Sequence, residues 1–414
     1  MHLDQLAALR TPDGERALAA AVDLAGGDPL SAATALRTRG VPAGLAAAAL
    51  TQAELRRRAV AKFGLAAATM FFTRAGLEQA TRAPVADRRA RRLRDAGVRT
   101  LVDLGCGLGA DALAAARAGI RVYGVEADPL TAALAAANAE ATGLADRFTV
   151  ECADATNFDL TGFDAAFCDP ARRRGGTGRR VFDPAAYTPS WDFVVGLTER
   201  VPRTVVKVAP GLDHALIPAG AEAEWVSVAG DLVEATLWCG PLAEVPRRAT
   251  LLTDRPPVTS GVERARSCRL TGDGTAEAPV GPLRRYLYDP DPAVVRAHLV
   301  ARLAERLPGN LADPTIAYVY ADAPVSTPFA RCLEITDVLP FSLKRLRALL
   351  RDRRVGRVEI LKRGSALDPE RLRRDLRLSG DESASVVLTR VAGAPTVLIG
   401  HPVAPMSNAR PEGS

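Results

Sequence analysis

The stretch 101–119, LVDLGCGLGADALAAARAG, most restricts what this chain can fold into. A short apolar run leads into a turn with glycine at positions 105, 107 and 109, and an alanine-rich segment follows at once. This order predicts a strand, a tight loop and a helix, with backbone N–H groups facing a ligand at the helix N-terminus. Glycine permits positive φ and a close backbone approach that a Cβ would obstruct. Asp103 adds a carboxylate at the end of the predicted strand.

Two classes of ligand use such a loop. Gly105, Gly107 and Ala110 match the G-x-G-x-x-[GA] pattern of dinucleotide binding. Asp103, with glycine at 105, 107 and 109, also matches the D-x-G-x-G-x-G loop of class I methyltransferases. Many tight strand–helix turns bind nothing, so the surrounding sequence has to support either interpretation. Glu126 ends a second β-rich run, 121–128, at the position from which an acidic side chain reaches a pair of ribose hydroxyls in both classes.

The strands that follow separate the two classes. Alternating strands and helices predict a parallel sheet with helices on both faces. The runs 224–228 and 232–239, the second extended toward 249–252, lack a helix-length spacer and predict an antiparallel pair. Five parallel strands followed by such a pair form the seven-stranded, Rossmann-like sheet of a methyltransferase, whereas a dinucleotide domain usually continues with a parallel sixth strand. The parallel strands are expected at 100–104, 121–126, 147–152, 164–168 and 203–208, with helices at 110–118, 129–142 and 186–200.

Outside this α/β domain, expected at 85–253, the composition changes along the chain. Residues 1–84 are rich in alanine and leucine and predict an N-terminal helical region. The proline-, glycine- and charge-rich residues 254–284 predict a linker. A separate α+β region is expected at 285–404, followed by a disordered tail at 405–414.

Cysteine and histidine usage restricts the compartment and the chemistry. The six cysteines form no C-x-x-C pair, which favours small core residues in a reduced compartment. The four histidines are scattered and lack the spacing of metal ligands. The sequence shows no signal peptide and no apolar run approaching ~18 residues. We therefore expect a cytoplasmic protein that binds no metal and does not span a membrane.

Carboxylates recur where the predicted strands end. In an open α/β sheet the ligand lies outside the carboxyl ends of the strands. Asp154 ends the third strand, where it could accept a hydrogen bond from an adenine amino group. Asp169 ends the fourth, and the ring of Pro170 holds its carbonyl rigidly. With Asp103 and Glu126, four successive strand ends each supply a carboxylate to one predicted pocket.

These motifs carry a family resemblance. DLGCGLGAD, VEAD, CAD and DPARR are similar to motifs of class I S-adenosylmethionine-dependent methyltransferases. The stretches 71–93, 169–184, 286–299, 339–364 and 367–380 resemble a bacterial family that couples such a domain to a C-terminal THUMP-like domain, here at about 330–403. The resemblance implies S-adenosylmethionine as cofactor and RNA, ribosomal or transfer, as substrate. It implies cofactor binding by Asp103, Gly105, Gly107, Gly109, Glu126, Asp154 and Asp169.

The residues predicted to contact the methyl acceptor differ from a motif that is common in methyltransferases. Methyltransferases acting on base amino groups typically carry [DN]-P-P-[YFW], but this chain has Asp169-Pro170-Ala171-Arg172. The second proline and the stacking ring are absent, although the planar guanidinium of Arg172 could stack on a base or bind a phosphate. We predict that Asp169 orients the acceptor and accepts its proton, aided by Pro170 and Arg172. Cys168 lies within the strand, so no proline–cysteine pair of the 5-methylpyrimidine type is expected.

Two clusters of basic residues indicate what kind of molecule the protein binds. The loop after Asp169 is rich in glycine and arginine, which suits a phosphate backbone, although a disordered surface loop is the alternative. Residues 344–377 hold 13 Lys/Arg against 5 Asp/Glu, a local charge of +8 that exceeds the +6 of the whole chain. This concentration favours binding of an RNA backbone. The predicted substrate-binding residues of the loop are Arg172, Arg173, Arg179 and Arg180.

Three other functions stay open at this point. One is a non-catalytic RNA-binding protein on a methyltransferase scaffold, and another is a methyltransferase of a small molecule or a protein. A nicotinamide-dependent oxidoreductase is disfavoured by the predicted antiparallel pair and by the DPARR motif.

Overall fold

The computed structural model describes residues 1–172, 187–252 and 267–403, and the side chains of Ala171 and Arg172 are not described. The chain forms two compact units. Unit 1 comprises Met1–Glu222 and Thr236–Glu244, and unit 2 comprises Ala223–Ala235 and Val245–Ser414. The predicted tail at 405–414 lies outside the described residues.

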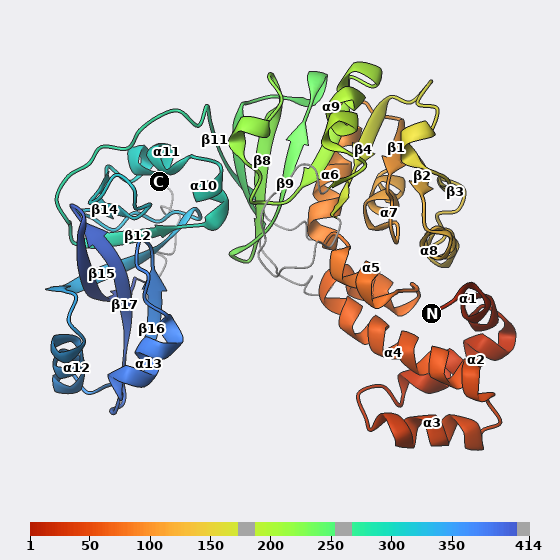
Figure 1. The fold of residues 1–414 in the computed structure, drawn as a ribbon, viewed down its shortest axis with the longest axis horizontal. Coiled ribbons are helices and arrows are strands. Elements are labelled where there is room, and N and C mark those ends of the chain that lie inside the picture. The colour runs from red at the N-terminus through yellow and green to blue at the C-terminus, as the bar shows by residue number, and fades with distance from the viewer. Residues whose placement is uncertain (173–186, 253–266, 404–414) are drawn as a thin grey trace, which may run out of the picture. The chain divides into compact units, whose positions relative to one another are not determined.

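Unit 1 begins with helices, as the sequence predicts. Proline stands in the first turn of α2 and α3, where its missing N–H costs nothing. The side chains of Thr11 and Asp28 cap these two helices by accepting from the backbone N–H of Gly14 and Ser31. Figure 1 shows these helices at the N-terminal end of the unit. They are α1 (Leu3–Leu9), α2 (Pro12–Val22), α3 (Pro29–Thr38), α4 (Ala43–Phe63), the 3-10 helix η1 (Gly64–Ala68), α5 (Arg74–Gln79) and α6 (Ala83–Asp95).

The rest of unit 1 is built on the predicted parallel strands. They are β1 (Thr100–Leu104), β2 (Arg121–Glu126), β3 (Phe148–Cys152), β4 (Ala165–Cys168) and β7 (Thr204–Val208). Their order is β3-β2-β1-β4-β7, and every pair is parallel. The connecting helices are α7 (Ala110–Arg117), α8 (Pro129–Ala141) and α9 (Trp191–Arg200). All carboxyl ends of these strands therefore meet at one edge of the sheet.

The sheet continues beyond the predicted seven strands. After β7 the order is β9-β8-β10-β11, so the sheet has nine strands in all. The run 249–252 does not extend β9. The short 3-10 helix η5 (Gly240–Leu242) separates this run from β9 along the chain. The run belongs to a separate strand, β10, which pairs parallel with β8 and antiparallel with β11. The bounds are β8 (Glu222–Val228), β9 (Asp231–Trp238), β10 (Arg247–Leu252) and β11 (Ser267–Gly272).

β11 lies inside the stretch predicted as a linker, 254–284. Only Leu270 of this strand is fully buried, so its hydrophobic pattern is too weak to stand out among the neighbouring prolines and glycines. The first part of that stretch, 253–266, lies outside the described residues.

Unit 2 contains a seven-stranded sheet of its own, in the order β13-β14-β12-β15-β18-β17-β16. The last part of the predicted α+β region consists of β15 (Ala330–Pro340), α12 (Leu343–Asp352), β16 (Val355–Lys362), α13 (Pro369–Leu376), β17 (Glu382–Val391) and β18 (Ala394–Pro402). Leu346 and Leu350 of α12 and Leu372 and Leu376 of α13 pack on the sheet in one core. Most basic side chains of both helices are therefore left exposed, whereas Arg347 is partly buried and donates to the backbone carbonyl of Asp375. The earlier elements are β12 (Tyr286–Pro290), α10 (Pro292–Arg296), α11 (Val300–Arg306), β13 (Asn310–Leu311) and β14 (Val319–Ala321).

Candidate active site

The three glycines of the loop between β1 and α7 have different physical roles. Gly105, Gly107 and Gly109 all have positive φ, at 85°, 56° and 84°. A Cβ on Gly109 would lie 2.7 Å from the Phe148 ring, so this glycine is needed for packing. A Cβ on Gly107 would meet no atom within 4 Å. The loop is thus packed at its helix end and open at Gly107, where a ligand could approach the backbone.

Asp103 is a buried carboxyl group with no hydrogen-bond partner among the described residues. Only 1% of this residue is exposed, and neither of its two oxygens has a partner. Burial, together with the negative charges of Asp111 and Asp169, raises the pKa of Asp103 well above its ordinary value. Leaving a carboxyl group unsatisfied in a protein interior costs free energy. Such a group at a strand end indicates a position that a donor or cation on a ligand would occupy.

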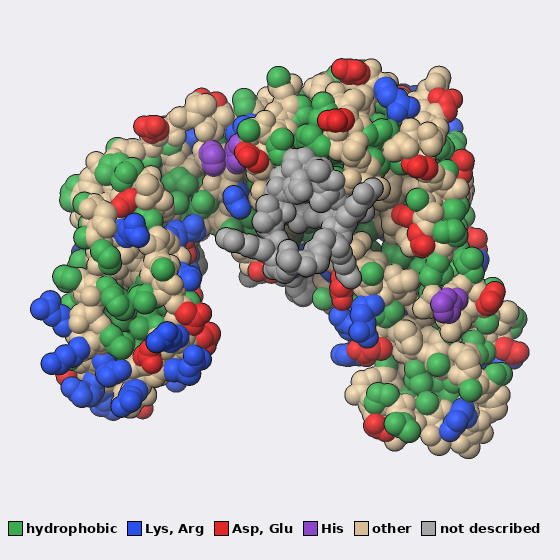
Figure 2. All heavy atoms as spheres, viewed as in Figure 1, with side chains coloured by type: hydrophobic (Ala, Val, Ile, Leu, Met, Phe, Trp, Pro, Cys, Tyr) green, Lys and Arg blue, Asp and Glu red, His purple; other side chains and the backbone are tan. Residues whose placement is uncertain are grey.

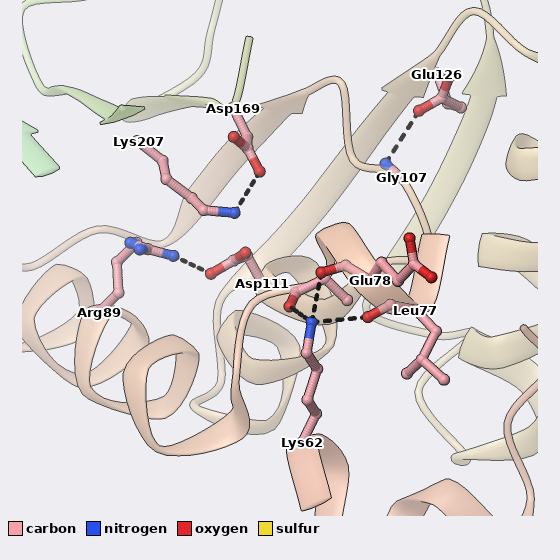
Figure 3. A network of polar contacts seen from close by, with 10 residues as sticks. Lys62, Leu77, Glu78, Arg89, Gly107, Asp111, Glu126, Asp169 and Lys207 are labelled. Carbon is pink, nitrogen blue, oxygen red and sulfur yellow. Dashed lines mark hydrogen bonds and ion pairs between the residues drawn. The ribbon is translucent and has the colours of Figure 1, made fainter. Parts of the chain in front are cut away.

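Glu126 holds the glycine loop from the neighbouring strand. Its Oε2 accepts a hydrogen bond from the backbone N–H of Gly107 at 3.0 Å, and its Oε1 accepts from that of Asp128, also at 3.0 Å. The side chain is half-buried at the end of β2. The predicted acidic residue therefore lies directly beside the open part of the loop (Figure 3).

Asp169, after β4, reaches the same loop. A Cβ on Gly105 would lie 3.5 Å from the backbone carbonyl oxygen of Asp169. The side chain of Asp169 forms an ion pair with Lys207 on β7, with 2.6 Å between Oδ2 and Nζ. Pro170 follows and is buried. Asp169 therefore presents its carbonyl to the glycine loop while a lysine holds its carboxylate.

Asp154 is placed at the end of β3 but is not joined to the other carboxylates by any contact within the described part of the chain. It is exposed, and its Oδ1 accepts hydrogen bonds from the backbone N–H and the hydroxyl of Thr156. These bonds lower the pKa of Asp154, so it carries a charge at neutral pH. The structure thus brings Asp103, Glu126 and Asp169 to one loop, and Asp154 to the next strand end along the same edge.

The predicted substrate-binding arginines are only partly placed. The backbone of Arg172 pairs with Tyr187 where β5 (Ala171–Arg172) meets β6 (Tyr187–Thr188). Arg173, Arg179 and Arg180 lie outside the described residues. The roles of these arginines remain predictions.

Sequence reasoning missed Arg89 and Asn138, two polar residues that support the loop from behind. Arg89 on α6 is 4% exposed, forms an ion pair with Asp111 in the first turn of α7, and lies 4.7 Å above the Phe167 ring. Asn138 on α8 is fully buried. It accepts from the backbone N–H of Phe71 and donates to the carbonyl of Leu108, at 2.6 and 3.0 Å. Asn138 could have been recognised as the single amide in a run of alanines.

The segment before β1 is fastened to this site by Lys62. The ammonium group, at the end of α4, donates to the carbonyls of Leu77 and Glu78, both at 2.7 Å, and of Ala80 at 3.0 Å, at the C-terminus of α5 (Figure 3). Burial, with the nearby positive charges of Lys207 and Arg82, lowers the pKa of Lys62 to about 8. The start of α5 packs under the glycine loop, since a Cβ on Gly76 would lie 2.8 Å from Leu108. The segment 74–80 is therefore held by Lys62 on one side and lies against the glycine loop on the other.

The residues at this edge fit a cationic nucleoside better than a dinucleotide. The open backbone at Gly107 and the acidic Glu126 suit a ribose. The buried, unpartnered carboxyl of Asp103 suits an ammonium or sulfonium group, whereas it would repel a diphosphate. S-adenosylmethionine carries both of these cations on one nucleoside. Among the described residues, no cluster of side chains could hold a metal ion, and no helix is long and apolar enough to span a membrane.

Comparisons with known proteins agree with this geometry. A model of a methyltransferase domain matches residues 101–172, a THUMP domain-like model matches 330–402, and a domain of unknown function matches 2–59. A protein of Mycobacterium tuberculosis, an uncharacterized S-adenosylmethionine-dependent methyltransferase, is 36% identical over 347 residues, which cover 81% of this chain and 90% of the relative. A 23S rRNA (uracil(1939)-C(5))-methyltransferase of Acidithiobacillus ferrooxidans is 42% identical over 78 residues, which cover 17% of this chain and 18% of that enzyme.

A solved structure from Porphyromonas gingivalis W83, of a protein assigned by inference to the methyltransferases, shares the fold. Its TM-score is 0.67 at 21% identity, with 88% of this chain and 92% of that chain covered. The identity and coverage of the mycobacterial relative exceed what a shared domain alone would produce. The chain therefore belongs to the family of S-adenosylmethionine-dependent methyltransferases with a C-terminal THUMP-like domain, and S-adenosylmethionine is its cofactor.

Proposed function

We propose that this methyltransferase modifies a base nitrogen of ribosomal or transfer RNA, with Asp169 and Pro170 at the acceptor and the basic C-terminal module on the RNA backbone. The bound cofactor supplies a methyl group on a positively charged sulfur. The acceptor nitrogen forms the new N–C bond with its lone pair, while the electrons of the broken C–S bond stay on sulfur. The nitrogen then releases a proton, and Asp169 is the group beside the loop that can take the hydrogen bond and pass the proton to water.

The surroundings of Cys168 favour nitrogen over carbon as the acceptor. Methylation at C5 of a pyrimidine by a proline–cysteine pair needs a thiolate nucleophile. Cys168 is fully buried within β4, and burial, with the charges of Asp169 and Asp103, raises the pKa of its thiol. The similarity to a uracil-C5 enzyme is short and covers 17% of this chain.

The observation that supports an RNA substrate is a set of exposed cations on the THUMP-like module. Most of its basic side chains are engaged, as in the ion pairs Arg353–Asp337 and Arg354–Asp381. Among the others, five exposed side chains on or next to α12 and α13 have neither an ion pair nor a side-chain hydrogen bond among the described residues. Lys and Arg colour this end of the unit in Figure 2. Free cations in such number suit phosphates. They are Lys344, Arg345, Arg351, Arg374 and Arg377.

The test is methyl transfer to RNA from a strain that lacks the gene. Purified protein and methyl-labelled S-adenosylmethionine are incubated with separated ribosomal and transfer RNA, and labelled nucleosides are identified by mass spectrometry. RNA from the deletion strain should accept label, whereas RNA from the parent strain, already modified, should accept little. Cofactor binding without transfer to either RNA would contradict the proposal and favour another acceptor or a non-catalytic scaffold.

Asp169→Ala is the matched variant for this assay. We expect it to abolish transfer while cofactor affinity stays within about tenfold, a difference of ~1.4 kcal/mol, because in the proposed role the carboxylate binds the acceptor. Calorimetry with S-adenosylmethionine measures the second quantity. Unimpaired turnover by this variant would remove Asp169 from the mechanism.

A further inference from the structure

Lys207 occupies a defined place at the acceptor side of the site. It is the fourth residue of β7, and the β4–β7 register pairs Cys168 with Val206. Residues 169 and 207 are the next pair in this register, so they lie side by side at the carboxyl ends of the two parallel strands. Two atoms, Nζ of Lys207 and Oδ2 of Asp169, lie 2.6 Å apart, and Figure 3 shows the two side chains pointing toward one another.

The burial of the two partners differs. The Lys207 side chain is 14% exposed, whereas that of Asp169 is 34% exposed. The lysine therefore contacts the carboxylate from the protein side, and the carboxylate is the partner that an incoming acceptor can reach. An ion pair at an exposed surface holds its groups loosely, but one with a mostly buried lysine holds the carboxylate in one orientation.

We infer that Lys207 is a positioning residue, which fixes the Asp169 carboxylate by one oxygen so that the other faces the acceptor nitrogen. This inference rests on the role of Asp169 in the proposed function. In this role Lys207 acts on the reacting atoms through Asp169. A fixed carboxylate lowers the entropy lost when the acceptor is oriented, and a misplacement of about 1 Å at such a group can reduce the rate about 100-fold.

The ammonium group of Lys207 also determines which chemical group the acceptor must carry. An ionised carboxylate only accepts hydrogen bonds, so the acceptor has to supply an N–H to it. The hydrogen bond places the nitrogen lone pair toward the methyl group before transfer. The chain thus selects acceptors that carry hydrogen on nitrogen, such as exocyclic or ring N–H groups of a base.

The inference is tested with full-length Lys207→Met, Lys207→Gln and Lys207→Arg. Arg16→Met, which removes an exposed ion pair with Asp13 on α2, serves as control. The kcat and KM for RNA are measured together with the affinity for S-adenosylhomocysteine. We expect Lys207→Met to lower kcat about 100-fold, with KM and cofactor affinity changed by less than about threefold. Lys207→Arg should recover kcat to within about tenfold of wild type, Lys207→Gln should lie between, and the control should be unchanged.

Two outcomes would overturn the inference. One is wild-type kcat in Lys207→Met, and the other is an equal loss of kcat and cofactor affinity in all three variants, which a merely structural role would produce. If wild-type protein methylates no RNA, the proposed function fails separately. Crystal structures of wild type and Lys207→Gln with S-adenosylhomocysteine then decide. A turned or disordered Asp169 carboxylate in the variant supports the positioning role, and an unmoved one refutes it.

Discussion

The strand ends of unit 1 and the helices of the THUMP-like module both collect charge, but in opposite ways. At the strand ends the charges are mainly acidic and few, and Asp103 is buried without a hydrogen-bond partner among the described residues. On α12 and α13 they are basic, numerous and exposed. The sheet fixes the position of each acidic group separately, at the end of its own strand. The basic side chains instead lie together on one helical surface.

This difference corresponds to two kinds of ligand. A small cofactor with a fixed charge is selected by a few desolvated groups, whose removal is costly because the effective dielectric is low. A polyanion is bound by many screened contacts, each of which contributes little. Single substitutions should therefore have large effects at the strand ends of unit 1 and small ones on the helices of unit 2.

The strongest test of the comparison is Asp103→Asn. We expect the affinity for S-adenosylmethionine to fall about 100-fold or more, since a buried ammonium or sulfonium loses its counter-charge. The same change should stabilise the cofactor-free protein by about 1 kcal/mol or more, because no charge needs to be buried. Calorimetry and urea unfolding measure the two effects.

The pH dependence of Asp103→Asn follows from the same group. The raised pKa of Asp103 means that the folded chain holds more protons than the unfolded chain above about pH 4. The free energy of unfolding of wild type relative to the variant should therefore decrease as pH rises from that value. A variant that is less stable than wild type at pH 7 would contradict the assignment of Asp103 as an unsatisfied group.

Substituting alanine for Gly107 and for Gly109 should separate an effect on cofactor binding from an effect on packing. Gly107→Ala should weaken cofactor binding about tenfold, because its Cβ would enter the open space at the loop, with a strain of about 1 kcal/mol from positive φ. Gly109→Ala should instead lower the free energy of unfolding by about 2–4 kcal/mol, since its Cβ would collide with Phe148. Gly143→Ala, also at positive φ with no atom within 4 Å, controls for strain alone. Equal cofactor affinity in Gly107→Ala and Gly143→Ala would place the ligand elsewhere.

On the helices of unit 2, only combined substitutions should matter. The triple variant Lys344→Gln, Arg345→Gln and Arg351→Gln should weaken RNA binding about tenfold and reduce the salt slope by up to about 3. Each change alone should alter affinity by about threefold or less. The double variant Arg353→Gln and Arg354→Gln, whose arginines have carboxylate partners, is the control and should have a smaller effect. Titrations of RNA at several salt concentrations measure both quantities, and a single substitution that abolishes binding would break the comparison.

Lys62 is expected to show the smallest effect. Its pKa of about 8 is below the ordinary lysine value, so between about pH 8 and 10 the folded chain holds fewer protons than the unfolded chain. Stability of wild type relative to Lys62→Met should therefore increase as pH rises through this window. Urea unfolding of both proteins at pH 7 and 9.5 measures the change, and a difference that is constant with pH would show that the pKa of Lys62 is ordinary in the fold.

Local signals explain why so much of unit 1 was predictable. Each parallel strand is a short apolar run, and each carboxylate follows its strand at a fixed distance along the chain. Asp103, Glu126 and Asp169 could be named because parallel strands bring all their carboxyl ends to one edge. β10 and β11 could not be predicted in the same way, because their pairing partners are distant in sequence and their apolar runs are brief.

The sequence by itself determined the glycine loop, the carboxylates at the strand ends and the basic composition of the C-terminal module. The tertiary structure decided which of these charges are compensated. Lys207 meets Asp169 across two strands, and Arg89 meets Asp111 across two helices, while Asp103 has no hydrogen-bond partner within the described chain. The reason is that propensity and periodicity act over a few residues, whereas burial and ion pairing depend on distances between residues that only the folded sheet brings together.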